Sequence, residues 1–260
     1  FYKIFPKQIN AGDYFFFFFI NLIELSDILK QGFLNGIKVT IPEGFRYKEI
    51  TNRLEKRDLI NREKFENLFK NKDFINKLGI KSTSLEGYLY PDTYYFVKSN
   101  TEKEIIKRMY NQLKEKLKEN KLIKKINESD FSLKDIITLA SLVEWEAQVD
   151  KERPIIAQVF IKRLKISKPL ESCASIEYAL DKHKKKLFEE DLEVESPFNT
   201  YKNYGLPPTP INNPGIKSIK AVLNPADTDY LYFVSKNDGT HIFNKSYNDH
   251  IKAKRKYQSW

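Results

Sequence analysis

The amino-acid sequence predicts an α+β fold, in which short paired strands accompany amphipathic and buried helices. Residues 37–41 (IKVTI) alternate between apolar and polar side chains, as in a half-buried strand. Residues 230–235 and 240–244 flank an Asn-Asp-Gly turn, which is typical of a β-hairpin. Within the segment 132–147, the residues from Ile136 to Val143 are apolar almost all round, which indicates a helix buried among other elements.

The N-terminal third is predicted to contain strands and short helices. The run Tyr14–Ile20 (YFFFFFI) is typical of a buried strand, and it is too short to span a bilayer as a helix, which takes about 20 residues. Ser26 is expected to cap a helix that ends at Gly32. After the strand at 37–41, the pattern predicts a turn at 42–44, helices over 47–57 and 61–70, and a strand over 93–97.

The remainder is predicted to be mainly helical, with helices over 101–120, 132–147, 152–165, 217–223 and 246–257. Thr101 and Ser132 stand at N-cap positions with an acid three residues later. Pro154 lies in the first turn of its helix, where proline is tolerated. Residues 196–215 (SPFNTYKNYGLPPTPINNPG) are rich in proline and amide side chains, so we expect a shaped loop without regular structure.

The composition is that of a folded chain with a basic surface. Of its 260 residues, 41% are hydrophobic and 14% are aromatic, which is enough apolar surface to offset the ordering entropy of a core. The 45 Lys and Arg residues against 35 Asp and Glu residues give a formal net charge of +10. Most of these cations are Lys and are interleaved with acids, as over 103–125. This pattern favours a solvated helix face over a surface for nucleic acid or lipid headgroups.

The cysteine and histidine content argues against several kinds of site. Cys173 is the single cysteine, so we expect no intrachain disulfide and no thiolate zinc site. The histidines, His183, His241 and His250, lack the spacing that puts two ligands on one helix face, and no glycine-rich phosphate motif occurs. We therefore expect no metal and no cofactor. No local motif supports Cys173 and His241 as a catalytic pair; Cys173 is expected to be a small buried hydrophobe, and His241 to pack or hydrogen-bond within the hairpin.

Glu144 stands out because it extends the apolar stripe of the buried helix. It follows Ala140 by four residues, whereas Glu146 lies about 200° away around the helix. Burial and the negative end of the helix would both raise the pKa of a carboxyl at this position, as a general acid near neutral pH requires. The alternative is an ion pair with Arg153 or Arg163, and the pattern alone leaves both possibilities open.

The loop at 196–215 carries groups that suit a carbohydrate. Amide and hydroxyl side chains pair with sugar hydroxyls, and aromatic rings cover the C–H faces of a sugar. The loop offers Asn199, Thr200, Tyr201, Asn203 and Tyr204 beside Gly205, Leu206, Pro207 and Pro208. An ordinary proline-rich surface loop is the alternative, and the sequence alone does not decide between the two.

Five segments, in register over nearly the whole chain, resemble the endolytic murein transglycosylases of the MltG (YceG-like) family. They are 85–94 (LEGYLYPDTY), 140–147 (ASLVEWEA), 152–164 (ERPIIAQVFIKRL), 196–215 and 221–250. Residues 37–54 also resemble the start of a LysM-like module, which this family has ahead of its catalytic part. The resemblance implies an N-terminal module at 1–97, with a LysM-like βααβ part at about 37–97, and a mixed α/β catalytic domain at 98–260.

The resemblance implies an enzyme that cleaves the MurNAc-β-1,4-GlcNAc bond within nascent peptidoglycan strands and leaves 1,6-anhydro-MurNAc ends. The family's catalytic glutamate is matched to the first Glu of the V-E-x-E stretch, Glu144, as a single general acid and base. The muramoyl C6 hydroxyl supplies the nucleophile, so neither water nor a second carboxylate is needed. The residues expected to bind substrate are Glu146, Glu171, Ser172, Tyr178, Asn199, Thr200, Tyr201, Gly205, Leu206, Pro207, Pro208 and Asn224.

The resemblance also implies a bacterial inner-membrane protein with a single N-terminal transmembrane helix, absent from this chain, and a periplasmic catalytic part. Peptidoglycan synthases are the expected protein partners, and no nucleic-acid partner is expected. The stretch 170–175 (LESCAS) departs from the family's L-Q-S-D-P-T, with Cys173 in place of Asp. A non-catalytic peptidoglycan-binding module is the main competing hypothesis, and a nucleic-acid-binding protein is the third.

Overall fold

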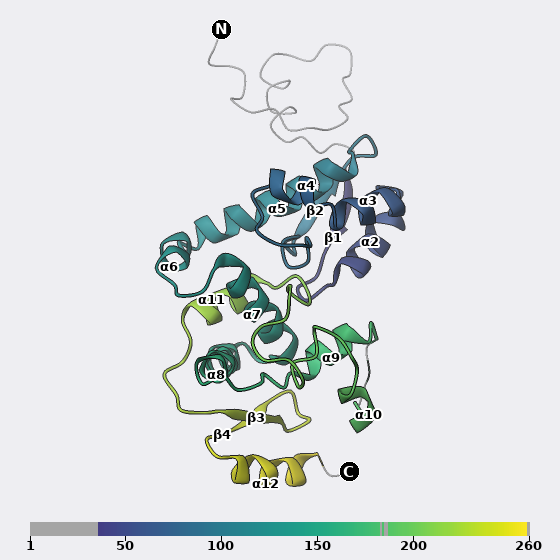
Figure 1. Ribbon diagram of the computed structural model, residues 1–260. Coiled ribbons are helices and arrows are strands. Elements are labelled where there is room, and N and C mark those ends of the chain that lie inside the picture. The colour runs from purple at the N-terminus through teal and green to yellow at the C-terminus, as the bar shows by residue number, and fades with distance from the viewer. Residues whose placement is uncertain (1–35, 183, 185–186, 259–260) are drawn as a thin grey trace, which may run out of the picture.

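The computed structural model describes residues 36–182, 184 and 187–258. Its fold is α+β, as predicted, with two small antiparallel sheets among many helices (Figure 1). The expected strand at Tyr14–Ile20 and the helix between Ser26 and Gly32 lie outside the described residues. Among the helices described, none combines the length and the apolar character needed to cross a membrane.

The upper part of Figure 1 contains a pair of antiparallel strands, and the chain between these two strands forms short helices. Ile37 pairs with Phe96 and Thr40 with Thr93. Where the LysM-like expectation has two helices between the strands, the structure has three. These elements are β1 (Ile37–Thr40), α2 (Tyr47–Glu55), α3 (Arg62–Phe69), α4 (Lys72–Lys77) and β2 (Thr93–Phe96).

The next helix, α5 (Glu102–Glu119), packs against this same part of the molecule. Thr101 and Glu104 form the predicted capping box at its N-terminus. Arg108 Nη1 donates to the carbonyl of Tyr95 over 2.7 Å, and the helix also contacts α3. A single hydrophobic core includes Val39 in β1 and also residues that follow α5 in the sequence, as far as Val222. The domain boundary between residues 97 and 98 stays a prediction.

The middle of the molecule is organised around α7 (Leu133–Glu146). Ser132 and Asp135 form the predicted cap, and every residue from Ile136 to Val143 is buried. The helix is therefore enclosed as predicted, and its last turn lies where several segments meet. The surrounding elements are α6 (Ile123–Asn127), the short helix η1 (Asp150–Glu152), α8 (Arg153–Lys165), α9 (Cys173–Ala179), α10 (Glu189–Leu192) and α11 (Ile216–Leu223). Of these, α8 and α11 make the most contacts with α7.

The lower part of Figure 1 is the predicted hairpin with the last helix across it. Strands β3 (Tyr232–Ser235) and β4 (His241–Asn244) pair antiparallel, and α12 (Tyr247–Tyr257) packs on both. Gly239 in the hairpin turn has a φ of +86°, which glycine adopts without strain. As predicted, residues 196–215 form no helix or strand.

Candidate active site

The carboxylate of Glu144 is enclosed by three segments. Arg153 Nη1 donates to Oε1 over 3.1 Å, while the Ser218 hydroxyl and the Gly215 amide donate to Oε2 over 2.8 and 2.9 Å. The side chains of Glu144 and Arg153 are only 6% and 9% exposed. The ion-pair alternative from the sequence is therefore confirmed, with Arg153 as the partner.

Glu43 brings a second carboxylate to this cluster. It lies in the turn before α2, and a Cβ on Gly215 would lie 1.8 Å from its Oε1, so only glycine leaves room for it. Burial raises the pKa of Glu43, and the nearby charge of Glu144 acts in the same direction. No local pattern connects Glu43 with a glutamate so distant in the sequence, which is why the sequence analysis missed it.

Glu146 lies on the other side of α7 and lines a pocket of about 470 Å³, called here the Glu146 pocket. Its Oε1 accepts a hydrogen bond from the Ser172 hydroxyl over 2.8 Å. Burial raises the pKa of Glu146, although the bonds from Ser172 and the Ala174 amide and the charge of His241 oppose the rise. The pocket is lined mainly by α8, the start of α9, the β3–β4 hairpin and α12.

Several residues expected to bind substrate surround Glu146. Glu171 and Tyr201 line the same pocket, and Ser172 stands behind it. Arg163 donates to Glu171 over 2.7 Å, so this arginine is not a partner of Glu144. Cys173 also lines the pocket, with its Sγ 3.3 Å from the Tyr201 hydroxyl. The expectation of a buried Cys173 is wrong, because the residue is exposed in the first turn of α9.

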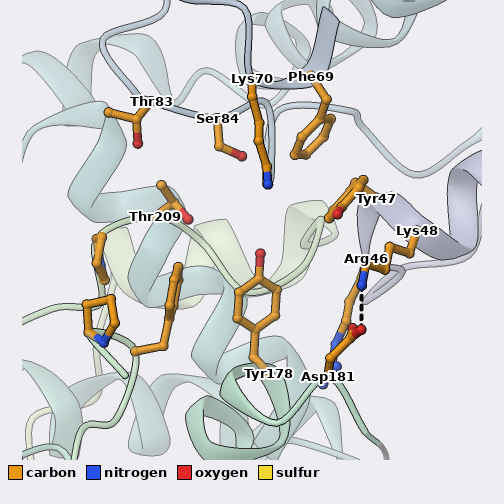
Figure 2. A pocket seen from close by; sticks show the side chains of 13 residues that line it. Arg46, Tyr47, Lys48, Phe69, Lys70, Thr83, Ser84, Tyr178, Asp181 and Thr209 are labelled. Carbon is orange, nitrogen blue, oxygen red and sulfur yellow. Dashed lines mark hydrogen bonds and ion pairs between the residues drawn. The ribbon is translucent and has the colours of Figure 1, made fainter. Parts of the chain in front are cut away.

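A second pocket, called here the Tyr178 pocket, has a volume of about 450 Å³ and lies between α2 and α3 on one side and α9 and the 196–215 loop on the other. Figure 2 shows the Tyr178 hydroxyl and the Lys70 ammonium pointing toward each other across it. The rings of Tyr47 and Phe69 stack at 4.2 Å in its wall. Tyr178 and Pro208, both expected to bind substrate, line this pocket rather than the one at Glu146.

Two buried ionisable residues that the sequence did not point to lie beside the Tyr178 pocket. Arg46 is 6% exposed, its guanidinium lies 4.6 Å from the ring centroid of Trp145, and its Nε and Nη2 have no hydrogen-bond partner. Glu86 is fully buried and accepts hydrogen bonds from the Tyr47 amide, Asn213 Nδ2 and the Tyr178 hydroxyl. Burial raises the pKa of Glu86 to about 8. The sequence signal that could have indicated a buried Glu86 is its position inside the aromatic segment 85–94.

The other expected substrate-binding residues do not line either pocket. Asn199 and Thr200 are buried: Asn199 Nδ2 donates to the carbonyls of Leu192 and Val194, and Thr200 Oγ1 accepts from the Ser172 amide. Both therefore shape the loop from within. Four more residues are absent from the lining of both pockets: Gly205, Leu206, Pro207 and Asn224. Asn224 is exposed at the C-terminus of α11, where it accepts a hydrogen bond from Lys125.

The fold and its pockets define an α+β protein in which a buried helix presents an acid to a cavity. The model of the YceG-like family matches residues 2–256, and the chain belongs to this family. A crystal structure of a YceG-like protein from Listeria monocytogenes has a TM-score of 0.75 and 31% identity, over 94% of this chain and 84% of that one.

Two curated relatives carry the name endolytic murein transglycosylase. The chain is 41% identical to the protein of Bacillus subtilis (strain 168) over 231 residues, which cover 87% of this chain and 63% of that protein. It is 36% identical to the protein of Streptococcus pneumoniae serotype 2 (strain D39 / NCTC 7466) over 156 residues, which cover 58% of this chain and 28% of that protein. The match thus spans less than two thirds of either relative.

Replacing Arg153 should destabilise the fold strongly. Arg153→Met leaves the Glu144 carboxylate buried without its cation, which typically costs about 3–5 kcal/mol. The matched control is Lys124→Met, which breaks the exposed ion pair between Lys124 and Glu128 and should cost less than about 1 kcal/mol. Urea denaturation measures both free energies of unfolding. Equal values for the two variants would contradict the role given to Arg153.

Glu86 should make the protein less stable as the pH rises. Because its pKa of about 8 in the folded state lies above the value of about 4.3 for an unfolded chain, the folded state binds more protons between these pH values. Its contribution is therefore most favourable below about pH 4.3 and is lost as the pH approaches 8. We expect Glu86→Gln to flatten the fall of Tm between pH 5 and 8, whereas exposed Glu128→Gln leaves it unchanged. The same slope in both variants would contradict this account.

Proposed function

We propose that the protein cleaves peptidoglycan strands internally, at the MurNAc-β-1,4-GlcNAc bond, and leaves 1,6-anhydro-MurNAc ends. The observation that carries the proposal is the partly buried carboxyl of Glu146, which lines a pocket of a size that suits a small ligand. Burial raises the pKa of this carboxyl, which favours its protonated form. Such a group can act as a general acid on a glycosidic oxygen. The names of the two curated relatives support the same activity.

The general acid in this proposal is Glu146, although the sequence prediction assigns the role to Glu144. Both carboxylate oxygens of Glu144 are occupied by donors, and its charge is compensated by Arg153. Glu144 lines neither the Glu146 pocket nor the Tyr178 pocket. Glu146 lines the open pocket, and the side chain that donates to it is a neutral hydroxyl, that of Ser172.

In the proposed reaction Glu146 gives its proton to the oxygen of the glycosidic bond, and the bond from that oxygen to C1 of the muramoyl residue breaks. The C6 hydroxyl of the same residue then attacks C1 and closes the anhydro ring. No water is consumed, so the reaction is that of a lyase, in contrast to hydrolases with two carboxylates. In the hypothesis from the sequence, one glutamate performs both steps: its carboxyl donates the proton, and the resulting carboxylate accepts the proton of the C6 hydroxyl.

The proposed place of action is outside the cytoplasm, where murein lies. A single membrane anchor ahead of the described residues and an association with peptidoglycan synthases belong to the same proposal. So does the assignment of residues 37–97 to a LysM-like module. The charge pattern favours a solvated surface rather than a nucleic-acid site, since most of its cations are Lys interleaved with acids.

Glu146→Gln removes the proton of the general acid and should lower the rate of cleavage about 10²–10⁴-fold. Purified glycan strands serve as substrate, and mass spectrometry measures the 1,6-anhydro ends. The matched control is Glu144→Gln, on the same helix turn, which should change the free energy of unfolding more than the rate per folded molecule. The opposite pattern would return the role to Glu144. Wild-type protein that releases no anhydro ends would contradict the proposed activity.

A binding module without catalysis is the second candidate, and the Tyr178 pocket favours it. Stacked rings, hydroxyls and the unpartnered nitrogens of Arg46 are groups that hold a saccharide with an acidic substituent. Lys70→Glu reverses the charge that points into this pocket and should weaken sedimentation with insoluble glycan strands. Glu146→Gln should sediment like the wild type. Retained sedimentation of Lys70→Glu would contradict a binding role for this pocket.

A further inference from the structure

Glu152 and His241 form a buried acid–imidazole pair beside the Glu146 pocket. Glu152 Oε2 lies 2.8 Å from His241 Nδ1, and Oε1 accepts a hydrogen bond from the His241 backbone amide over 3.2 Å. The two side chains are 8% and 7% exposed. One carboxylate thus holds both the main chain and the ring of His241, which fixes the position and the orientation of the imidazole.

The packing around the hairpin brings this ring to the end of α7. The ring of Phe233 meets that of His241 edge to face, with centroids 5.4 Å apart. In the hairpin turn, a Cβ on Gly239 would lie 3.0 Å from Oε1 of Gln148, so the turn lies directly against the segment after α7. His241 lines the same pocket as Glu146, and its positive form favours the charged form of Glu146.

We propose that His241, oriented by Glu152, accepts the proton of the muramoyl C6 hydroxyl during the reaction in the Glu146 pocket; this inference rests on the proposed function. Glu152 occupies Nδ1, which leaves Nε2 as the ring nitrogen available to a ligand. A carboxylate behind an imidazole holds its tautomer and stabilises the imidazolium that forms.

The step balances without a further reactant. The proton of Glu146 goes to the leaving glycosidic oxygen, and the bond from C1 to that oxygen breaks with its electron pair. The C6 oxygen forms the new bond to C1, and its proton goes to Nε2 of His241. The imidazolium then returns a proton to the Glu146 carboxylate, which restores both groups for the next turnover. Glu146 thus acts only as the general acid and His241 only as the general base, so one carboxyl does not have to perform both proton transfers.

Other titratable groups around the pocket are less suited to this role. Glu171 is paired with Arg163, and Cys173 shares a hydrogen bond with the Tyr201 hydroxyl. His250 has no partner at Nδ1, so no carboxylate orients its ring. The charged and titratable side chains that face His241 and Glu146 from the packed elements are Glu152, Arg163, Glu171, Cys173, Tyr201, Tyr232, Tyr247, His250 and Lys254.

The pH dependence of cleavage tests this assignment. A histidine base must be neutral, so kcat/KM should rise with pH along an acidic limb. His241→Asn keeps an amide in place of Nδ1 but removes Nε2. We expect it to lower kcat/KM by at least about 100-fold and to abolish that limb. Glu152→Gln keeps a hydrogen-bond acceptor but loses the charge that stabilises the imidazolium, so the limb should move to lower pH. The matched control is Asp238→Ala, which removes the acceptor of Thr240 in the same hairpin, outside the pocket lining. The Asp238→Ala variant should keep the pH dependence of kcat/KM that the wild type has.

The outcomes separate this inference from the proposed function. If the wild type releases anhydro ends but His241→Asn keeps the acidic limb and the rate, the proposed function stands and the role of His241 is overturned. If the wild type releases none, both fail. Should His241→Asn not fold, NMR titration of the histidines in the wild type and in Glu152→Gln decides. The His241 resonance must titrate at the pH of the limb and move with it; a resonance that titrates elsewhere overturns the proposal.

Discussion

A charged side chain at the end of a buried helix must be compensated where it lies, and Glu144 imposes this condition on the centre of the molecule. Eight consecutive residues of α7 are buried before it, from Ile136 to Val143, so water cannot solvate its carboxylate freely. The compensating groups come from Arg153 at the start of α8 and from the segment that begins α11. One carboxylate therefore holds two further helices against α7. Because Gly215 is also in close contact with Glu43, the same cluster joins the turn before α2.

This arrangement fixes the rotation of α7 about its axis and so decides what its last turn presents to either side. With Glu144 turned toward Arg153, Glu146 is directed about 200° away, into the pocket beneath the hairpin. The two acids are two positions apart, yet one is held by a cation while the other has its pKa raised by burial. Environment rather than residue type therefore gives these two carboxyls different electrostatic surroundings.

Local signals predicted the longer helices, whereas several short helices and the contacts between distant segments were not predicted. Thr101 and Ser132 mark their helices because a cap and its acid lie within one turn. Helix α4 was missed because it starts directly after α3 and spans only six residues.

The site residues depend on contacts between distant segments. The helical period predicted that Glu144 is buried, but it did not show whether Arg153 or Arg163 is its ion-pair partner. The Glu146 pocket joins residues from α7 to α12, so no sequence window contains it. Cys173 was misplaced for the same reason, since its exposure depends on how α9 meets the loop.

The two pockets are connected physically through α9 and the loop beside it. Cys173 at the start of this helix lines the Glu146 pocket, and Tyr178 near its end lines the Tyr178 pocket. The two residues are five positions apart along the helix, a rise of about 8 Å. The helix cannot easily shift, because Thr200 accepts from the Ser172 amide and shares a hydrogen bond with the Ser175 hydroxyl. Buried hydrogen bonds of this kind keep the wall common to both pockets in one position. Thr200 therefore supports the wall that both pockets share, although it lines neither of them.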